Sequence, residues 1–227
     1  MASNFAKQLV PPILLQLVRK CLRKDIETAN GTLNKVGSEK GPDWYDESFE
    51  GTEHWREDYT CSRYYFLWSL IVDRLIRDGL DRVFDVGCGP GQFACLARDR
   101  GIKHYWGLDF SKKRIEYARS VCPEFQFILE DALKTDKFQS IEYQVVIMTE
   151  VLEHVEDDLG LLSLLRPGTR VVASVPDFPY ESHVRHFKSV SEVSDRYGPL
   201  MSSLHVDELR SVRGDHRYFL FDGTTAA

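Results

Sequence analysis

The stretch Val83-Phe-Asp-Val-Gly-Cys-Gly-Pro-Gly-Gln-Phe-Ala94 is the clearest indication of the fold of this chain. It opens with a short apolar run around one acid, which is typical of a buried strand, and glycines follow at positions 87, 89 and 91. Glycine lets the backbone turn sharply and approach a ligand, because it has no Cβ atom. Pro90 has a φ suited to the start of a helix, whose first N–H groups can bind a carboxylate. We therefore predict a strand, a ligand-binding turn and a helix.

Strands and helices alternate along the chain on both sides of this stretch. The expected strands are 82–86, 105–108, 125–129, 143–148 and 170–175, and the expected helices between them are 92–100, 112–121 and 157–165. This spacing indicates βαβ units and a parallel sheet. Segments 203–210 and 217–222 are strand-like and separated by a short turn, so they must pair antiparallel. The predicted fold is α/β: a doubly wound, Rossmann-like, seven-stranded sheet, mostly parallel with an antiparallel C-terminal strand pair.

The N-terminal part of the chain has a different pattern. Residues 5–24 are expected to form an amphipathic helix that packs on the main domain or on a second copy in a homodimer, or that contacts an anionic membrane surface. Residues 29–52 are rich in small and polar residues, which predicts an irregular connection, and 53–77 are helical in pattern. We therefore divide the chain into an N-terminal region, 1–52, and a main domain, 53–227.

Composition and charge narrow the functional class. The chain has 227 residues, room for one full-sized α/β domain, and no apolar run approaches the ~20 residues of a membrane span. Its five cysteines form no CxxC pair, which fits reduced thiols in the cytoplasm. The formal charge is −6 although residues 1–24 are basic, so the main domain is acidic and would repel a phosphate backbone. We expect a cytoplasmic protein without a nucleic-acid partner.

The glycine spacing distinguishes between two kinds of ligand. A dinucleotide site reads Gly-x-Gly-x-x-Gly and would require glycine at position 92, which is Gln92. The chain has Gly-x-Gly-x-Gly instead, with the acid Asp85 just before the turn. An acid at this place suits a ligand that carries an ammonium and a sulfonium group.

The stretch from Asp85 to Gly91 resembles the first motif of class I S-adenosylmethionine-dependent methyltransferases. The resemblance extends over residues 80–222 and implies that Asp109, at the end of the second strand, holds the ribose hydroxyls. It also places Asp131 near the adenine, although both acids could equally be turn or helix-capping residues. The implied S-adenosyl-L-methionine-binding residues are Asp85, Gly87, Cys88, Gly89, Gly91, Asp109, Phe110, Asp131, Ala132, Thr149, and, before the first strand, Arg63 and Tyr64.

A second dense motif begins at Thr149, where the fourth strand ends. If 150–154 form a helical turn, Glu150, Glu153 and His154 share one face and could bind a metal ion with mixed oxygen and nitrogen ligands. The pattern is similar to ubiquinone-pathway O-methyltransferases and small-RNA 3′-end 2′-O-methyltransferases, which implies Mg²⁺ or Mn²⁺. Such an ion would lower the pKa of an acceptor hydroxyl. In metal-independent relatives the first Glu only lines the pocket and the His packs locally.

Two histidines after the fifth strand complete the candidate site. His183 and His186 follow a proline-containing segment, and an imidazole there could act as general base, with His186 slightly favoured. In the other interpretation each histidine only caps a loop. The candidate catalytic residues are His186, His183, Glu150 and His154.

A hydroxyl acceptor would need such a base or metal, whereas an amine would not. We therefore predict O-methylation of a hydroxyl on a sugar or other small polar metabolite. The chain also resembles methyltransferases of bacterial surface-polysaccharide gene clusters. The alternatives are a small-RNA or tRNA ribose 2′-O-methyltransferase and a non-catalytic cofactor-binding partner protein.

Overall fold

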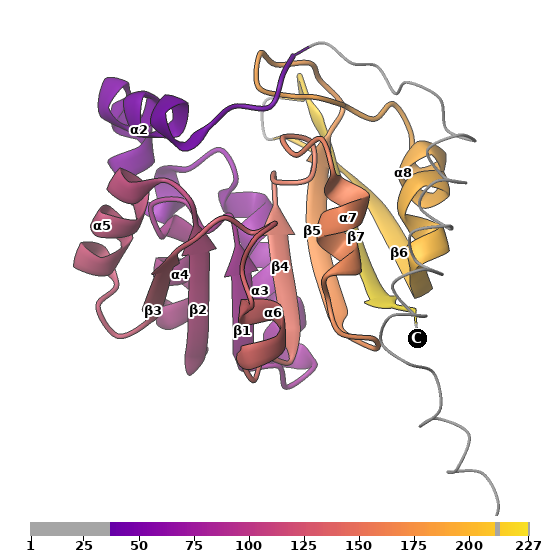
Figure 1. Ribbon diagram of the computed structural model, residues 1–227, viewed down its shortest axis with the longest axis horizontal. Helices are drawn as coiled ribbons and strands as arrows, with labels where there is room; N and C mark the ends of the chain where they lie inside the picture. Colours follow the sequence, from indigo (N-terminus) through magenta and orange to yellow (C-terminus); the bar gives the residue numbers. More distant parts are fainter. Residues whose placement is uncertain (1–36, 212–213, 227) are drawn as a thin grey trace, which may run out of the picture.

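A seven-stranded sheet forms the centre of the computed structural model, which describes residues 37–211 and 214–226 (Figure 1). The strands in chain order are β1 (Arg82–Val86), β2 (His104–Asp109), β3 (Gln126–Leu129), β4 (Val145–Thr149), β5 (Arg170–Pro176), β6 (Met201–Arg210) and β7 (Arg217–Thr225). Their order across the sheet is β3-β2-β1-β4-β5-β7-β6, and β7 pairs antiparallel with both β5 and β6. The predicted fold is confirmed.

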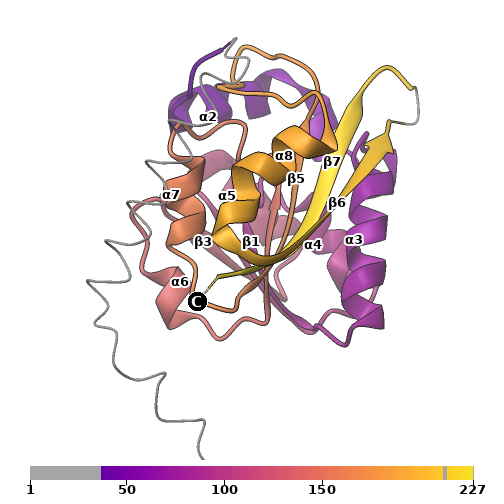
Figure 2. The same cartoon turned by 90° about the vertical axis from the view of Figure 1, so that its right-hand side faces the viewer.

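Helices cover both faces of the sheet (Figure 2). The helices are α2 (Pro42–Gly51), α3 (Tyr65–Arg77), α4 (Gln92–Asp99), α5 (Lys112–Val121), α6 (Lys137–Ser140), α7 (Asp158–Ser163) and α8 (Val190–Tyr197). Apolar side chains of α3, α4 and α5 share one buried cluster, and those of α6, α7 and α8 share another on the opposite face. Strand β1 lies between β2 and β4, so the order in which the strands are added to the sheet reverses at β1. Open α/β sheets bind ligands beyond the carboxyl ends of strands at such a point.

The segment before the sheet differs from the sequence prediction in two ways. Residues expected as an irregular connection contain α2, which begins with Pro42 at its first turn and buries Phe49. The single helix expected over 53–77 is wrong in its first half, where two 3₁₀ turns, Glu53–Arg56 and Tyr59–Cys61, precede α3. The break occurs because the Asp58 side chain accepts a hydrogen bond from the Thr60 N–H and caps a new turn.

The N-terminal helix predicted over residues 5–24 lies outside the described residues. Its contacts with a membrane or a second copy, and the boundary at residue 52, stay predictions. Among the described residues, no helix is both long and apolar enough to cross a membrane.

Candidate active site

The glycine-rich turn after β1 adopts backbone angles that glycine favours. Gly87, Gly89 and Gly91 all have positive φ, of 75°, 54° and 85°. A Cβ atom on Gly87 would lie 2.5 Å from the Val151 Cγ2 atom, so this position also has no room for a side chain. The sequence prediction of a sharp turn into a helix is confirmed, because α4 starts directly after Gly91.

Asp109 links the end of β2 to this turn. Its carboxylate is buried and accepts hydrogen bonds from the N–H groups of Gly89, at 2.9 Å, and Ser111, at 2.8 Å. Burial raises the pKa of Asp109, and these donors and Arg114 oppose the rise. Asp109 lines a cavity together with Phe110, Asp131 and Ala132. The structure thus brings together four residues that were predicted from the sequence.

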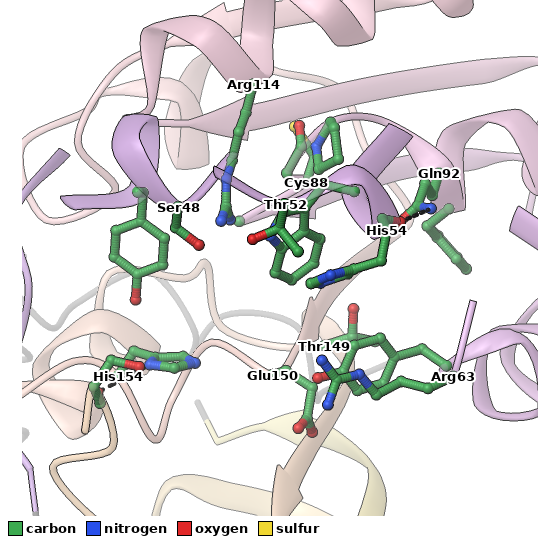
Figure 3. A pocket seen from close by; sticks show the side chains of 18 of the residues that line it. Ser48, Thr52, His54, Arg63, Cys88, Gln92, Arg114, Thr149, Glu150 and His154 are labelled. Carbon is green, nitrogen blue, oxygen red and sulfur yellow. Dashed lines mark hydrogen bonds between the residues drawn. The ribbon is translucent and has the colours of Figure 1, made fainter. Parts of the chain in front are cut away.

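A second cavity adjoins the first and lies over the turn. Of the site residues predicted from the sequence, those that line this second cavity are Asp85, Gly87, Cys88, Gly89, Arg63, Tyr64, Thr149, Glu150, His154 and His183. Asp85 is buried at its floor, accepts a hydrogen bond from the Tyr105 hydroxyl, and has its pKa raised to about 7 by burial. Arg63 and Tyr64 precede α3 rather than lying inside it. Figure 3 shows the Arg63 guanidinium pointing towards Glu150.

Glu150 lies at the carboxyl end of β4 in a left-handed conformation, with φ of 55°. The hypothesis of a helical turn over 150–154 is therefore wrong, and α7 begins only at Asp158. The Glu150 N–H donates to the Ser174 Oγ, and the Ser174 hydroxyl donates to the Glu150 Oε1 at 2.8 Å. Burial raises the pKa of Glu150 to about 7, while this hydrogen bond and the Arg63 charge act to lower it.

Three other side chains come together beside Glu150. One ligand atom from each of Glu153, His154 and His183 lies within 4.8 Å of the others, and Glu150 is outside this group. Glu153 is fully buried, and neither of its carboxylate oxygens accepts a hydrogen bond from a described residue. Burial, together with the charge of Glu150, raises its pKa well above the usual range.

The two histidines in this cluster are oriented by backbone carbonyls. His154 Nδ1 donates to the Ser182 carbonyl at 3.0 Å, and His183 Nδ1 donates to the Phe178 carbonyl at 2.9 Å. Burial lowers the pKa of His154 to about 3 and also lowers the pKa of His183, so both rings are neutral at pH 7. In this tautomer the Nε2 atom of each ring has a free lone pair. Metal-binding histidines are commonly oriented in the same way.

Contacts of the loop after β5 bring His183 to the end of β4. The Val184 N–H donates to the Glu153 carbonyl at 2.8 Å, and the buried Arg185 guanidinium donates to the carbonyls of Leu152, Val155 and Glu156. His186, which the sequence slightly favoured, is buried but is not among the residues that line the two cavities. The geometry therefore favours His183 over His186 as the histidine that faces a substrate.

Several residues that line the cavity over the glycine turn were missed from the sequence. Trp44, Tyr45 and Ser48 from α2 belong to the segment expected to be irregular, and His54 and Trp55 belong to the first half of the segment expected to be one helix. Pro42 followed by spaced aromatic residues was a detectable helix signal. Arg114, Ser174 and Arg185 were missed too, and no local pattern marks their roles.

Comparison with known proteins gives the family. A family model described as a methyltransferase domain matches residues 45–213. The chain belongs to this methyltransferase family. The match confirms the class I S-adenosylmethionine-dependent methyltransferase that the sequence predicts, and the enzyme class uses S-adenosylmethionine as its cofactor.

Relatives of this methyltransferase differ in substrate. Trans-aconitate 2-methyltransferase of Escherichia coli O157:H7 is 29% identical over 110 residues, which cover 47% of this chain and 44% of that enzyme. The chain thus spans less than half the length of this curated relative. The 1,6-didemethyltoxoflavin-N1-methyltransferase of Burkholderia thailandensis has a similar structure, with a TM-score of 0.61 at 16% identity, covering 85% of this chain and 94% of that one.

Magnesium protoporphyrin IX methyltransferase of Synechocystis, whose structure contains bound S-adenosylhomocysteine (SAH), also has a similar fold. It has a TM-score of 0.59 at 18% identity and covers 80% of this chain and 96% of that one. At these identities the likeness shows a shared fold and does not assign an acceptor.

Proposed function

We propose that this enzyme transfers the methyl group of S-adenosylmethionine to a hydroxyl oxygen of a small polar molecule. The observation that carries this proposal is the cluster of Glu153, His154 and His183 next to Glu150, in which Glu150 and the two histidines line the cavity over the glycine turn and Glu153 lies buried behind them. An amine acceptor needs only to be neutral, whereas a hydroxyl must lose a proton as it attacks. Four titratable side chains at one place are suited to removing the proton of a hydroxyl.

The two adjoining cavities provide a place for the cofactor. We infer that the ribose hydroxyls bind Asp109 and that the adenine lies beside Phe110 and Ala132 in the cavity these residues line. The amino-acid part then lies over Gly87 and Gly89, with the sulfonium methyl directed towards the end of β4. This arrangement follows the general location of ligand sites in open α/β sheets.

The reaction needs few groups once both substrates are held. The acceptor oxygen attacks the methyl carbon in line, the bond between carbon and sulfur breaks, and the electron pair of that bond stays on sulfur. The hydroxyl proton passes to a neighbouring base, and Glu150 is suited to this role because its pKa of about 7 lies near the working pH. Positioning of the two reactants supplies much of the rate.

The cluster beside Glu150 also fits a divalent cation. Glu153 supplies a buried carboxylate without hydrogen-bond donors, and His154 and His183 supply Nε2 lone pairs. Mixed carboxylate and imidazole donors suit an ion such as Mn²⁺, whereas Mg²⁺ prefers oxygen ligands. When bound, the ion would lower the pKa of the acceptor hydroxyl. This set replaces Glu150 of the sequence prediction with His183.

Two measurements test the proposal. The first is calorimetric titration of Mn²⁺ into the SAH-saturated protein, for which we expect His183→Ala to weaken Mn²⁺ binding about 10- to 100-fold. His205→Ala, a change at an exposed histidine on β6, should leave the titration unchanged. Equal Mn²⁺ affinity in the wild type and His183→Ala would reject the metal proposal.

The second measurement identifies the acceptor atom. The enzyme and isotopically labelled S-adenosylmethionine are incubated with sugars, acidic sugars, hydroxy acids and matched amines, and the products are analysed by NMR. We expect the label on a hydroxyl oxygen. Transfer only to nitrogen or to a carboxylate oxygen would overturn the proposed methylation of a hydroxyl.

A further inference from the structure

Arg114, in the first turn of α5, extends into the cavity region and has no assigned role in the reaction. Its side chain lines both cavities, and Figure 3 shows it reaching from the ribbon into the pocket. Only 7% of the residue is exposed. Its guanidinium stacks on the rings of Tyr45, at 4.9 Å, and Trp55, at 4.7 Å.

This buried cation has no anionic partner within the described part of the chain. No described carboxylate lies within ion-pairing distance of the Arg114 side chain, and its Nε atom is buried without a hydrogen-bond acceptor. The acid that affects it most is Asp109, whose oxygens already accept N–H groups from the glycine turn and from Ser111. A buried charge without a hydrogen-bonded partner is costly, so a bound anion would stabilise this arrangement.

Two hydroxyl groups lie on the same side of the cavity. Ser48, from α2, and Thr52, just after it, line the pocket, and Figure 3 shows both beside the end of Arg114. Glu150 and His154 lie at the opposite side of the pocket in this view. A molecule held by an anionic group at Arg114 can therefore present another of its atoms to Glu150.

We propose that Arg114, Ser48 and Thr52 form an anion-binding subsite that holds a carboxylate group of the methyl acceptor. Resting on the proposed function, this makes the acceptor a hydroxy acid or an acidic sugar, held by its carboxylate and methylated on a hydroxyl. A planar guanidinium binds a carboxylate through two parallel hydrogen bonds, and hydroxyl groups can donate to the same oxygens. A single cation close to Asp109 matches a singly charged carboxylate better than a doubly charged phosphate.

The test measures binding and does not depend on methyl transfer. Trans-aconitate and glucuronate, as carboxylate probes, are titrated calorimetrically into the SAH-saturated protein, with glucose as the neutral counterpart of glucuronate. We expect at least one carboxylate probe to bind. Arg114→Gln should weaken the binding of that probe about 10- to 100-fold, because hydrogen bonds to a charged group are lost. Lys112→Gln removes the same charge from an exposed position in the same turn and should change nothing. Ser48→Ala should weaken binding of the probe several-fold. Because this variant keeps the guanidinium, it tests the subsite even if Arg114→Gln does not fold.

The carboxylate of the cofactor is the competing source of an anion. SAH and methylthioadenosine, which lacks the amino-acid part, are therefore titrated into the wild type and Arg114→Gln. Equal affinity of each ligand for both proteins supports the subsite for the acceptor. Weaker binding of SAH alone to Arg114→Gln would assign Arg114 to the cofactor and overturn the proposal.

The proposal is also overturned if the wild type binds SAH but neither carboxylate. That outcome leaves O-methylation of a neutral hydroxyl intact. Transfer of the methyl to nitrogen would overturn the proposed function without affecting the binding result.

Discussion

At the scale of single residues, Asp109 is the predicted cofactor contact with the clearest structural support. It is an acid at the end of a strand, and its buried carboxylate fixes the glycine turn through Gly89 as well as facing the cavity. The sequence left open whether this acid was only a turn or capping residue. It does accept the Ser111 N–H as a turn residue would, so the two interpretations describe one side chain with two roles.

We predict that Asp109→Ala weakens SAH binding about 100-fold, because the change removes the ribose acceptors and loosens the glycine turn. Calorimetric titration of SAH measures the effect. Asp136→Ala, at an exposed acid paired with Lys137 and outside both cavities, serves as the control and should leave SAH affinity unchanged. Undiminished affinity in Asp109→Ala would disprove the placement of the ribose.

Glu150 predicts a pH dependence. Its pKa is raised to about 7, so the carboxylate that can accept a proton is lost as the pH falls below that value. With Glu150 as the base, kcat should fall about tenfold for each pH unit below 7. Glu150→Gln should remove most of the activity together with this acid limb. A variant that keeps both the rate and the pH profile would exclude Glu150 as the base.

Ser174 acts on the same group as a positioning residue. Its hydroxyl donates to the Glu150 carboxylate and so favours the ionised form. Removing it in Ser174→Ala should raise the pKa of Glu150 and move the acid limb of the kcat profile to higher pH. Ser174→Thr keeps a hydroxyl and should restore the profile, and an unshifted limb in Ser174→Ala would contradict the role.

At the scale of elements, α2 covers the two cavities because it is tied to the start of α5. Asp46 of α2 accepts hydrogen bonds from the Ser111 hydroxyl and from the Lys113 N–H at 3.1 Å. Next to it, Tyr45 contacts the ring of Phe110 on the wall of the cavity. These contacts hold α2 over the place proposed for the cofactor.

We predict that Asp46→Ala speeds SAH dissociation about tenfold and changes the association rate little, because two hydrogen bonds that hold α2 over the cavities are lost. Stopped-flow fluorescence measures both rates. Glu47→Ala, an exposed acid in the same helix, is the matched control. The same dissociation rate in Asp46→Ala and Glu47→Ala would show that α2 does not retain the cofactor.

At the scale of the whole molecule, one buried carboxylate joins three segments of the C-terminal half. Asp158 of α7 accepts two hydrogen bonds from Arg196 and one from the Tyr197 hydroxyl, both on α8. Arg185, from the loop that carries His183, lies 3.3 Å from the same carboxylate. The stability of the fold and the position of His183 therefore depend on a shared network.

We predict that Asp158→Asn lowers the free energy of unfolding by about 3–5 kcal/mol, because it leaves buried guanidinium groups without their counter-charge. Chemical denaturation monitored by circular dichroism measures the loss. Asp195→Asn, at an exposed position of α8, should change stability by less than about 0.5 kcal/mol. A loss of similar size in both variants would show that the network contributes little.

The fold could be predicted from the sequence because its signals are local. The glycines after β1 require positive φ, and alternating apolar strands and helices leave a parallel sheet as the solution. The same logic placed Asp109, Phe110 and Ala132 at one edge, since the carboxyl ends of parallel strands lie together. The helix over 53–77 was predicted too long because periodicity does not reveal the Asp58 cap that interrupts it.

The sheet, the glycine turn and the residues that follow each parallel strand could thus be predicted from local sequence patterns. Which side chains share the acceptor cavity depends on how distant segments pack together. His183 reaches Glu153 and His154 through loop contacts made by Val184 and Arg185. The Arg114 guanidinium stacks on the rings of Tyr45 and Trp55, which lie far from it in the sequence. The physical reason is the sequence separation over which the interactions act. Backbone conformation is set by near neighbours in the chain, whereas a site is assembled by packing between segments far apart in sequence. No local pattern encodes that packing.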